Sequence, residues 1–390
     1  MRVTLVTETF APQVNGVSRT LGQLVDYLEA VGDQVQVVHP DYGTAPTGPG
    51  RCRVPAVPLP FYPEVRVPLP PFGGVSRAID SFRPDLIHVA TEATLGWHAL
   101  RHAGRRGIPV VSSFHTNFDQ YCDHYHLGWG KGLAWRYLRW FHNRTAETYV
   151  PSEVTIADLA ARGFERLVLW PRGVDGTLFR PDRPGRDAVR RRLGFGPDDV
   201  VIGHVSRLAA EKNAPFLAEA LRIVAERDPR ARFLIVGDGP ERPRFERMMG
   251  PSARFVGYRS GDDLADHFAA ADLFAFASVT ETFGNVVLEA LASGLPVVAL
   301  RAGGVGSIVE DGLTGTLLGP DQPADRFAAA LIALMDRPAR RHAMSLAARE
   351  YAVEQTWDSI MGRLRGNYLD VLDRAGEALE MAGAAAGSAY

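Results

Sequence analysis

Short apolar runs alternate with stretches of helical character along the chain, and no other feature constrains its fold as strongly. The runs cover residues 3–7, 35–39, 85–89, 109–114 and 167–170 in the first half, and residues 200–206, 233–236, 254–256, 272–277 and 296–300 in the second. Runs this short and this apolar are typical of strands that are buried on both faces. Strands that alternate with helices predict a parallel, doubly wound sheet, here one in each half of the chain.

Proline and glycine separate the two halves. The segment Arg172–Asp175 contains a glycine and is followed by Phe179, Pro181 and Pro184, a composition typical of a domain boundary. At 390 residues the chain is long enough for two domains that each bury a core. We therefore expect an α/β protein with two Rossmann-like domains, over residues 1–173 and 174–354.

The C-terminal segment and one long loop complete this interpretation. From residue 324 onward the pattern is helical, and residues 355–390 have no sheet of their own to cover. We expect these last helices to return and complete the first domain, with a frayed tail of small residues from residue 382. The proline-rich residues 40–71 are expected to form a loop region.

Composition narrows the classes of function. A net charge of −2 gives no reason to expect nucleic acid as a partner. The two cysteines, Cys52 and Cys122, lack metal-ligand spacing, which argues against a zinc site and a disulfide framework. Met1 leads directly into the strand-like residues 2–7, which do not resemble a secretory signal. No apolar run approaches the roughly 20 residues that span a bilayer. We therefore expect a cytoplasmic protein.

Two carboxylates eight positions apart flank the start of a short helix in the second half. Glu281 follows the strand 272–277 at its C-terminal edge, where open α/β sheets bind ligands. The helix expected over residues 285–293 is apolar nearly all round, so Glu289 on it needs a hydroxyl or a cation as its partner. A solvated Glu281 and a Glu289 paired with a structural arginine are the alternative reading of the same pattern.

Three other predicted strands are followed by residues that can bind a ligand. Arg207 and Lys212 come after the first strand of the second half, and Lys212 is one of only two lysines in the chain. Two cations at a helix start suit a diphosphate, whereas a surface arginine and a Glu211/Lys212 ion pair are the alternative. Gly16 precedes the first helix and allows an anion to approach its backbone amides. His115 closes the strand 109–114, at the edge where ligands bind.

Together these segments resemble the retaining glycosyltransferases of family 4, and the resemblance runs nearly end to end. Within the family the chain is most similar to the lipid-directed branch of GDP-mannose-dependent α-mannosyltransferases and sulfoquinovosyl-diacylglycerol synthases. The resemblance implies the GT-B fold, in which two Rossmann-like domains face each other across a cleft. It is carried by Thr7–Val17, Phe114-His115-Thr116, Arg172–Asp175, Arg207 with Glu211-Lys212, Val236–Pro240, and Glu281 with Glu289.

The resemblance also implies a role for each candidate residue. Gly16, Arg207 and Lys212 would hold the diphosphate of a nucleotide-sugar donor. Glu281 would hold the sugar together with backbone amides, and Glu289 would hold the ribose. His115 would lie beside the anomeric carbon. The amides belong to Phe283, Gly284, Asn285 and Val286, and Tyr258 lies in the loop expected near the nucleobase.

Such enzymes transfer a hexosyl group with retention of configuration, which implies a same-face displacement without a protein nucleophile. Arg207 and Lys212 can stabilise the leaving diphosphate, and no Asp-x-Asp follows a strand, so we expect neither a metal nor another cofactor. The departing phosphate oxygen can take the acceptor's proton, so His115 is expected to position the sugar instead of acting as a base. GDP-mannose is the first expectation for the donor and a lipid or glycolipid hydroxyl for the acceptor.

Other functions stay open at the level of sequence. A UDP-sugar carrying glucose, glucuronate or sulfoquinovose could be the donor and diacylglycerol the acceptor, because no residue separates guanine from uracil. A GT-B sugar-nucleotide epimerase would use the same scaffold without an acceptor. A silent sugar-binding protein would have no reason to keep both the cations and the carboxylates. A dehydrogenase is disfavoured, since Gly-x-Gly-x-x-Gly does not follow the first strand.

Residues 129–144 are rich in aromatic and basic side chains, among them Arg136, Arg139, Trp140 and Arg144. A helix of this composition can lie on anionic lipid, so we expect peripheral association with the inner face of the cytoplasmic membrane. A half-buried helix with snorkelling arginines is the alternative.

Overall fold

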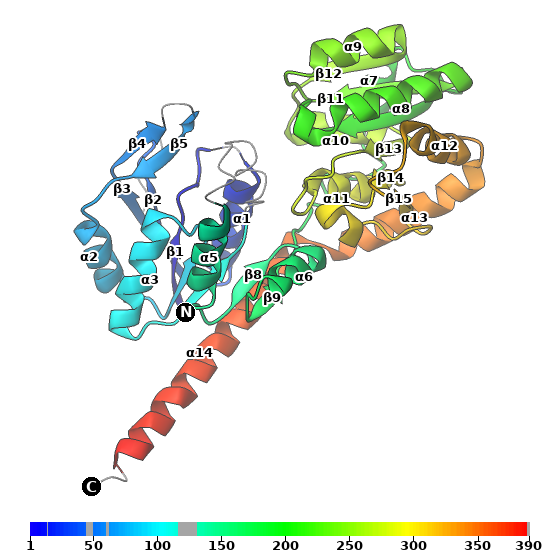
Figure 1. Cartoon of the computed structure of the whole chain (residues 1–390). Helices are drawn as coiled ribbons and strands as arrows, with labels where there is room; N and C mark the ends of the chain where they lie inside the picture. Colours follow the sequence, from blue (N-terminus) through cyan, green and yellow to red (C-terminus); the bar gives the residue numbers. More distant parts are fainter. Residues whose placement is uncertain (14, 44–49, 60–61, 116–130, 388–390) are drawn as a thin grey trace. The chain divides into compact units, whose positions relative to one another are not determined.

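The chain folds into two compact units in a computed structural model (Figure 1). One unit consists of Met1–Pro171 together with Asp358–Tyr390, and the other of Arg172–Trp357. The C-terminal residues therefore belong with the first half of the chain. The structure describes residues 1–13, 15–43, 50–59, 62–115 and 131–387.

The first unit is built on a parallel sheet. In the described part of the chain this sheet has seven strands in the order β3-β2-β1-β6-β7-β8-β9, and each strand is parallel to its neighbours. The strands are β1 (Arg2–Val6), β2 (Gln34–Pro40), β3 (Arg51–Val54), β6 (Leu86–Val89), β7 (Val110–Ser113), β8 (Thr148–Val150) and β9 (Leu167–Leu169). β8 has three residues, too few to stand out as an apolar run.

The described residues between 40 and 71 are largely strands, not the loop region that their prolines predict. β3 extends the sheet beside β2, while β4 (Ala56–Leu59) and β5 (Tyr62–Pro68) pair as an antiparallel hairpin. Proline is tolerated on edge strands because its missing N–H faces away from the ladder. β3 is an edge strand and the hairpin has two edges, so the prediction of a loop was wrong here for a physical reason.

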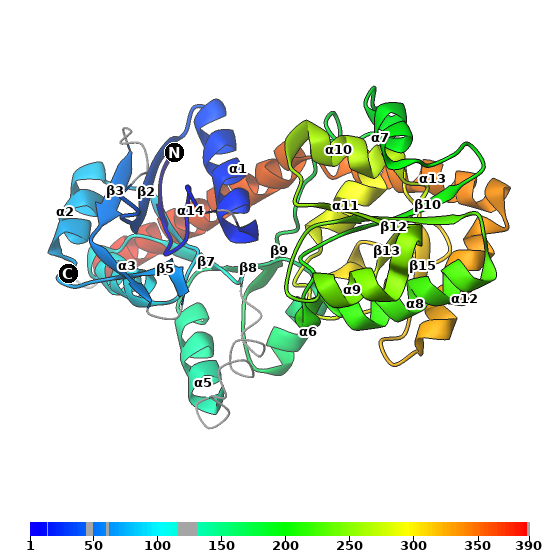
Figure 2. The same ribbon diagram turned by 90° about the horizontal axis from the view of Figure 1, so that it is seen from above.

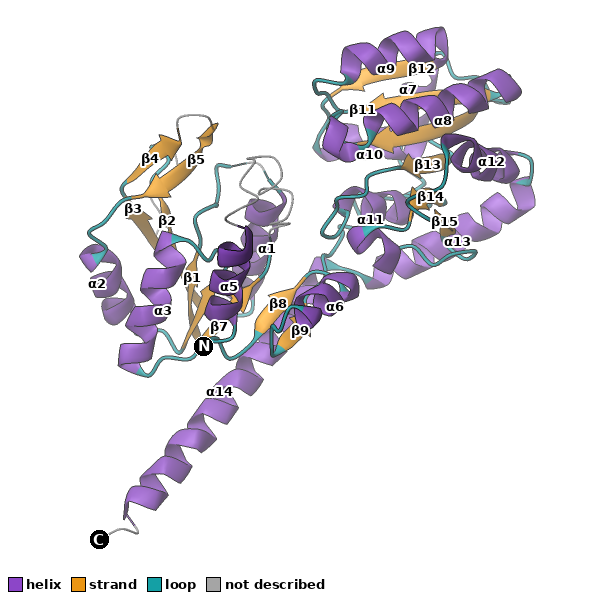
Figure 3. Cartoon of the chain, viewed as in Figure 1, coloured by secondary structure: helices purple, strands orange, loops and turns teal. Residues whose placement is uncertain are grey.

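Helices cover both faces of the first sheet (Figure 3). Ile87 and Val89 of β6 share a core cluster with residues of α2, α3 and α5, whereas His88 between them bonds to Tyr368 of α14. Successive strand side chains point to opposite faces, so α14 packs on the other face (Figure 2). The helices are α1 (Gly16–Ala30), α2 (Gly73–Phe82), α3 (Thr94–Arg106), α5 (Lys131–His142), α6 (Glu153–Ala161) and α14 (Trp357–Gly387).

The last helix also corrects one expectation. Small residues from 382 onward predict fraying, but α14 continues as a helix to Gly387. Alanine, which dominates this tail, has the highest helix propensity of the amino acids, which favours continuation of the helix.

The second unit repeats this plan. Its described residues form six parallel strands in the order β12-β11-β10-β13-β14-β15. The strands are β10 (Val200–Val205), β11 (Ala231–Val236), β12 (Ala253–Gly257), β13 (Leu273–Phe276), β14 (Val297–Leu300) and β15 (Gly315–Leu318). The helices are α7 (Arg186–Leu193), η2 (Ala210–Lys212), α8 (Ala214–Arg227), α9 (Arg242–Met249), η3 (Gly250–Ser252), α10 (Gly261–Ala270), α11 (Asn285–Ala292), η4 (Gly303–Ser307), α12 (Ala324–Met335) and α13 (Pro338–Glu354).

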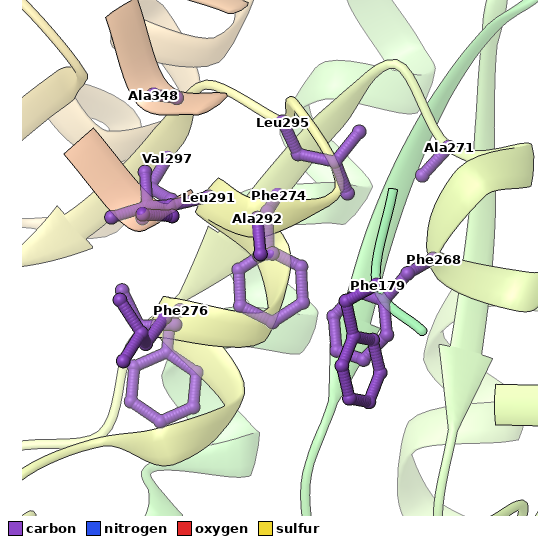
Figure 4. Packing of buried hydrophobic residues seen from close by; sticks show 14 of the residues in the cluster. Phe179, Phe268, Ala271, Phe274, Phe276, Leu291, Ala292, Leu295, Val297 and Ala348 are labelled. Carbon is purple, nitrogen blue, oxygen red and sulfur yellow. The ribbon is translucent and has the colours of Figure 1, made fainter. Parts of the chain in front are cut away.

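Alternating side chains of β13 fill two cores. Phe274 and Phe276 pack with α10 and α11 in the cluster drawn in Figure 4, whereas Leu273 and Ala275 pack with α8 and α12 in a second cluster. All four are fully buried, and burial of each large apolar side chain contributes about 1.5–3 kcal/mol. The strand is therefore apolar at every position because helices cover the sheet on both faces.

Both sheets reverse their strand order once. The reversal lies between β1 and β6 in the first unit, and between β10 and β13 in the second. This order confirms the predicted Rossmann-like, doubly wound architecture. Ligands of such sheets bind outside the C-terminal ends of the strands that flank the reversal. The loops that follow these four strands are therefore the places to look for a site.

Candidate active site

An ion pair joins the loops that follow β10 and β13. Lys212 ends the short helix η2 after β10, and Glu281 lies in the loop after β13. Lys212 Nζ donates a hydrogen bond to Glu281 Oε1 at 2.6 Å, and the two side chains are 25% and 19% exposed. Two residues predicted to bind phosphate and sugar separately therefore lie together where the strand order reverses.

Hydrogen bonds to the backbone hold these two loops against each other. Asn213, which follows Lys212, donates from its side-chain amide to the carbonyl oxygen of Ala277 at 3.2 Å. Its backbone is left-handed, with φ at 57°, a conformation in which asparagine is enriched. Thr280 Oγ1 donates to the carbonyl oxygen of Glu211 at 2.8 Å. The positions of Lys212 and Glu281 are thus fixed by more than their ion pair.

A buried histidine connects the same two strands beneath the loops. His204 of β10 donates from Nδ1 to the carbonyl oxygen of Ala275 at 2.9 Å, and its Nε2 is bonded to Ser206 Oγ at 2.8 Å. Burial lowers the pKa of His204 to about 4, so the ring is neutral at pH 7. A neutral ring has one donor and one acceptor nitrogen, which matches one bond to a carbonyl and one to a hydroxyl.

A helix start with its backbone amides lies shortly after Glu281. α11 begins at Asn285 after Gly284, whose φ of 104° suits glycine. The first N–H groups of a helix have no partner inside it and favour negatively charged or oxygen ligands. Asn285 Oδ1 is also buried, without a hydrogen-bond partner in the described chain. A buried acceptor without a partner is costly, so a ligand hydroxyl would be favourable at this place.

A glycine pair after β14 packs against the Glu281 loop. The N–H of Gly304 donates to the carbonyl oxygen of Glu281 at 2.9 Å. A Cβ on Gly304 would lie 2.4 Å from Cα of Phe283, and one on Gly303 would lie 2.1 Å from the carbonyl oxygen of Glu281. A larger residue would therefore push η4 away, so these glycines fix the backbone that carries the carboxylate.

Glu289 is buried on α11, as its apolar surroundings predict. It is 4% exposed between Leu288 and Ala290, which are also buried. Glu289 is not without a partner in the chain, and a buried charge needs one. Its role in holding a ribose stays a prediction.

Arg207 and Tyr258 are largely exposed. The side chain of Arg207 is 67% exposed, with Nη1 3.6 Å from Glu211 Oε1. The surface pair considered for Lys212 and Glu211 is therefore made by Arg207 instead. Tyr258 is 69% exposed and follows the edge strand β12. Neither side chain is joined to the Lys212–Glu281 pair by an interaction in the described structure.

Gly16 and His115 belong to the first unit. Gly16 opens α1, and Asn15 before it caps the helix by accepting a bond from the N–H of Ser18 at 2.8 Å. His115 follows β7, with Nε2 bonded to Ser113 Oγ at 2.8 Å. His115 therefore follows the C-terminal end of a strand, as predicted, whereas Gly16 lies at the start of the first helix. Thr116, the third residue of the predicted motif, is outside the described residues.

Sequence reasoning missed Glu8 in the first unit. Glu8 follows β1, and its Oε1 accepts a bond from the N–H of Leu95 at 2.8 Å. Its own N–H donates to Thr91 Oγ1 at 2.8 Å, so Glu8 joins the loops after β1 and β6 at the reversal of the first sheet. Burial raises the pKa of the Glu8 carboxyl. An acidic residue directly after a buried strand was the signal that could have found it.

The described residues contain no cluster of side chains suited to a metal ion. Within the described ranges no three His, Cys, Asp or Glu side chains are arranged to hold a metal ion. The chemistry that the arrangement offers is electrostatic: a cation, helix amides and a carboxylate converge on the end of one sheet.

Comparison with known proteins covers both units. The family model described as Glycosyltransferase Family 4 matches residues 14–178, and the model described as Glycosyl transferases group 1 matches residues 199–337. A GDP-mannose-dependent alpha-mannosyltransferase of Mycobacterium tuberculosis is 35% identical over 383 residues, which cover 96% of this chain and 98% of that relative. The chain belongs to glycosyltransferase family 4. A sulfoquinovosyl transferase of Arabidopsis thaliana is 33% identical over 362 residues, 90% of this chain and 70% of the relative.

Solved structures agree with this assignment at the level of fold. HepE of Anabaena, in complex with UDP, superposes with a TM-score of 0.78 at 19% identity, over 95% of this chain and 100% of that one. Sucrose-phosphate synthase from Thermosynechococcus elongatus gives a TM-score of 0.75 at 21% identity, over 96% and 99% of the two chains. The predicted family, the GT-B fold and the enzyme class are confirmed, and this family 4 protein is a glycosyltransferase.

Proposed function

We propose that this glycosyltransferase moves a mannosyl group from GDP-mannose to a hydroxyl group of a lipid or glycolipid, with retention of anomeric configuration. Three relatives named GDP-mannose-dependent alpha-mannosyltransferase, 32–36% identical over most of the chain, support the donor. Transfer from a UDP-sugar to diacylglycerol is the second candidate. A relative named alpha-monoglucosyldiacylglycerol synthase, from Streptococcus pneumoniae, supports that acceptor at 28% identity.

The observation that carries the proposal is the Lys212–Glu281 pair at the reversal of the second sheet. An ammonium group in this place can bind a diphosphate. The carboxylate and the amides of residues 283–286 can bind sugar hydroxyls. When the donor binds, phosphate oxygens take over part of the hydrogen bonding of Lys212. Glu281 then accepts a bond from the sugar, so the 2.6 Å contact holds both groups ready for one ligand.

The same groups account for the chemistry. Negative charge develops on the diphosphate as its bond to the anomeric carbon breaks, and Lys212 and Arg207 stabilise that charge. The departing phosphate oxygen takes the proton of the attacking hydroxyl on the same face of the sugar. Glu289 binds the ribose, and His115 positions the sugar without acting as a base. A metal ion and other cofactors have no assigned role in this scheme.

A thermal-shift panel of GDP, UDP, ADP and their sugars tests the donor. A ligand at 100 times its Kd stabilises the folded protein by about 2.7 kcal/mol, so GDP-mannose should raise the unfolding temperature clearly. Glu281→Gln should lose more of the GDP-mannose shift than of the GDP shift, because the carboxylate binds the sugar. Stabilisation by UDP-sugars alone would mean that the donor is a UDP-sugar instead of GDP-mannose. If no nucleotide sugar stabilised the protein, the proposal would be contradicted.

We further propose that α5 places the enzyme on a membrane surface. Leu133 is 68% exposed and Trp140 is 37% exposed on this helix, and Arg136 and Arg139 are exposed beside them. The guanidinium of Arg144 lies over the ring of Trp140, 4.3 Å from its centroid. In the described residues no helix is long and apolar enough to cross a bilayer. Residues 129 and 130 of the predicted segment are outside the described ranges.

Co-sedimentation with vesicles of anionic phospholipid tests this second proposal. Each basic residue near such a surface contributes about 1 kcal/mol, so replacing Arg136, Arg139 and Arg144 by serine should release most of the bound protein. The matched control replaces the exposed Arg227, Arg244 and Arg247 of the second unit. Equal release by both triple variants would mean that α5 has no special part in binding.

A further inference from the structure

A chain of hydrogen bonds crosses the first unit from α14 to His115. Tyr368 OH is bonded to Nδ1 of His88 at 2.6 Å, and Nε2 of His88 is bonded to Ser113 Oγ at 2.8 Å. Ser113 Oγ is in turn 2.8 Å from Nε2 of His115. Tyr368, His88 and Ser113 are all fully buried. The last helix of the chain is therefore connected to the predicted active-site histidine through two neighbouring strands, β6 and β7.

The hydrogens of Tyr368 and His88 in this series of hydrogen bonds can be assigned by counting donors and acceptors. Burial lowers the pKa of His88 to about 3 and raises the pKa of the Tyr368 hydroxyl well above its usual value, so both groups are neutral at pH 7. Among the described residues, the one partner of the Tyr368 hydroxyl is Nδ1 of His88. A buried hydroxyl donates its hydrogen where an acceptor is available, so Nδ1 accepts and His88 carries its own hydrogen on Nε2.

The remaining protons follow in the same direction. The N–H of His88 donates to Ser113 Oγ, whose other partner within the described chain is Nε2 of His115. If Ser113 donates to that nitrogen, the hydrogens on Tyr368, His88 and Ser113 each have an acceptor. If His115 donated from Nε2 instead, Ser113 would receive two hydrogens and its own hydroxyl hydrogen would be buried without an acceptor, which is costly.

We infer that Tyr368, His88 and Ser113 hold His115 in the tautomer that carries its hydrogen on Nδ1, and that they are positioning residues for glycosyl transfer. In this form Nδ1 carries the hydrogen of the ring, and Nε2, the basic nitrogen, is occupied by Ser113. His115 then has no free base to offer an acceptor hydroxyl. The part about transfer rests on the proposed function, whereas the tautomer does not.

Nuclear magnetic resonance of protein labelled with 15N in its histidine rings tests the tautomer directly. His115 is assigned by the signal lost in His115→Gln. We expect a ring protonated at Nδ1 in the parent. Ser113→Ala removes the donor to Nε2, and Tyr368→Phe removes the hydrogen that orders His88. Both variants should therefore move His115 toward the form protonated at Nε2.

Tyr149→Phe is the matched control. The Tyr149 ring lies 5.8 Å from that of His88 and 5.9 Å from that of Tyr368, centroid to centroid, but its hydroxyl donates to Glu147 Oε2. This variant removes a buried hydroxyl from the same cluster and should leave the His115 spectrum unchanged. A parent ring protonated at Nε2, or a His115 spectrum that Ser113→Ala does not change, would overturn the inference.

Kinetics adds the link to transfer. Loss of one neutral hydrogen bond changes an equilibrium a few-fold to about tenfold, so Tyr368→Phe and Ser113→Ala should lower kcat/KM by that factor while Tyr149→Phe stays at the parent value. If the tautomer is as inferred but no nucleotide sugar is turned over, the proposed function is wrong while the inferred hydrogen bonds and tautomer are still supported. If turnover is normal in all three variants, the positioning role is wrong.

Discussion

Replacing Lys212 by methionine tests the phosphate site sharply, because methionine keeps the length of the side chain and removes its charge. Nζ contacts Glu281 at 2.6 Å, and the side chain is 25% exposed. A charge-assisted hydrogen bond contributes about 1.5–3 kcal/mol, against about 0–1 kcal/mol for an exposed pair. Lys212 gives up part of its bond to Glu281 when a diphosphate binds. We therefore expect the lower value, about 1.5 kcal/mol, which is about tenfold in affinity.

Titration calorimetry with GDP and with guanosine separates phosphate binding from the rest. Lys212→Met should bind GDP about tenfold more weakly or worse and guanosine as the parent does. Arg222→Met is the matched control, since Arg222 is a cation of α8 in the same unit and pairs with Glu226 on the surface. GDP affinity equal to the parent's in Lys212→Met would mean that the lysine only pairs with Glu281, and the phosphate site would be refuted.

Three further predictions follow from the same geometry. Glu289→Ala should weaken guanosine and GDP by the same factor in calorimetry, because both share the ribose; a loss confined to GDP would contradict that role. Gly304→Ala should weaken donor binding and destabilise the second unit by about 1–3 kcal/mol. Gly306→Ala should be tolerated, because its Cβ would meet only Arg301 Cγ at 3.5 Å. Equal urea midpoints for the two variants would contradict the packing argument. Lowering the pH from 7 to 5 should cost about 2 kcal/mol for each of two buried histidines. His88 and His204 have pKa values of about 3 and about 4 when folded, below the value of about 6.5 in an unfolded chain. Their stabilising effect is therefore lost as the pH falls below 6.5, and equal urea midpoints at pH 7 and 5 would contradict it.

The sheets and the place of the site could be predicted because each depends on short stretches of sequence. A strand buried on both faces, such as β13, is apolar at every position, and the residue after it marks the ligand-binding edge. Glu281 and Lys212 were found in this way as separate candidates. The fixed helix start after Gly284 could also be read locally, since glycine and the following apolar run lie within ten residues.

Contacts between distant residues could not be predicted in this way. Lys212 meets Glu281 because β10 and β13 are neighbours, although 69 positions separate the two residues. Tyr368 meets His88 across 280 positions, and nothing in the local sequence of α14 marks that tyrosine. The strands in residues 40–71 were missed for a related reason, because an edge position, which makes proline acceptable, is a property of the sheet.

The most direct test of the central claim is transfer itself. Purified protein is incubated with radiolabelled GDP-mannose or UDP-glucose and vesicles made from a bacterial lipid extract, and the label in the lipid fraction is counted. We expect label from GDP-mannose in an α-linked product, and at least tenfold less with Glu281→Gln, which loses a charge-assisted bond to the sugar. Failure to label any lipid from either donor, by protein that binds GDP in calorimetry, would contradict the account.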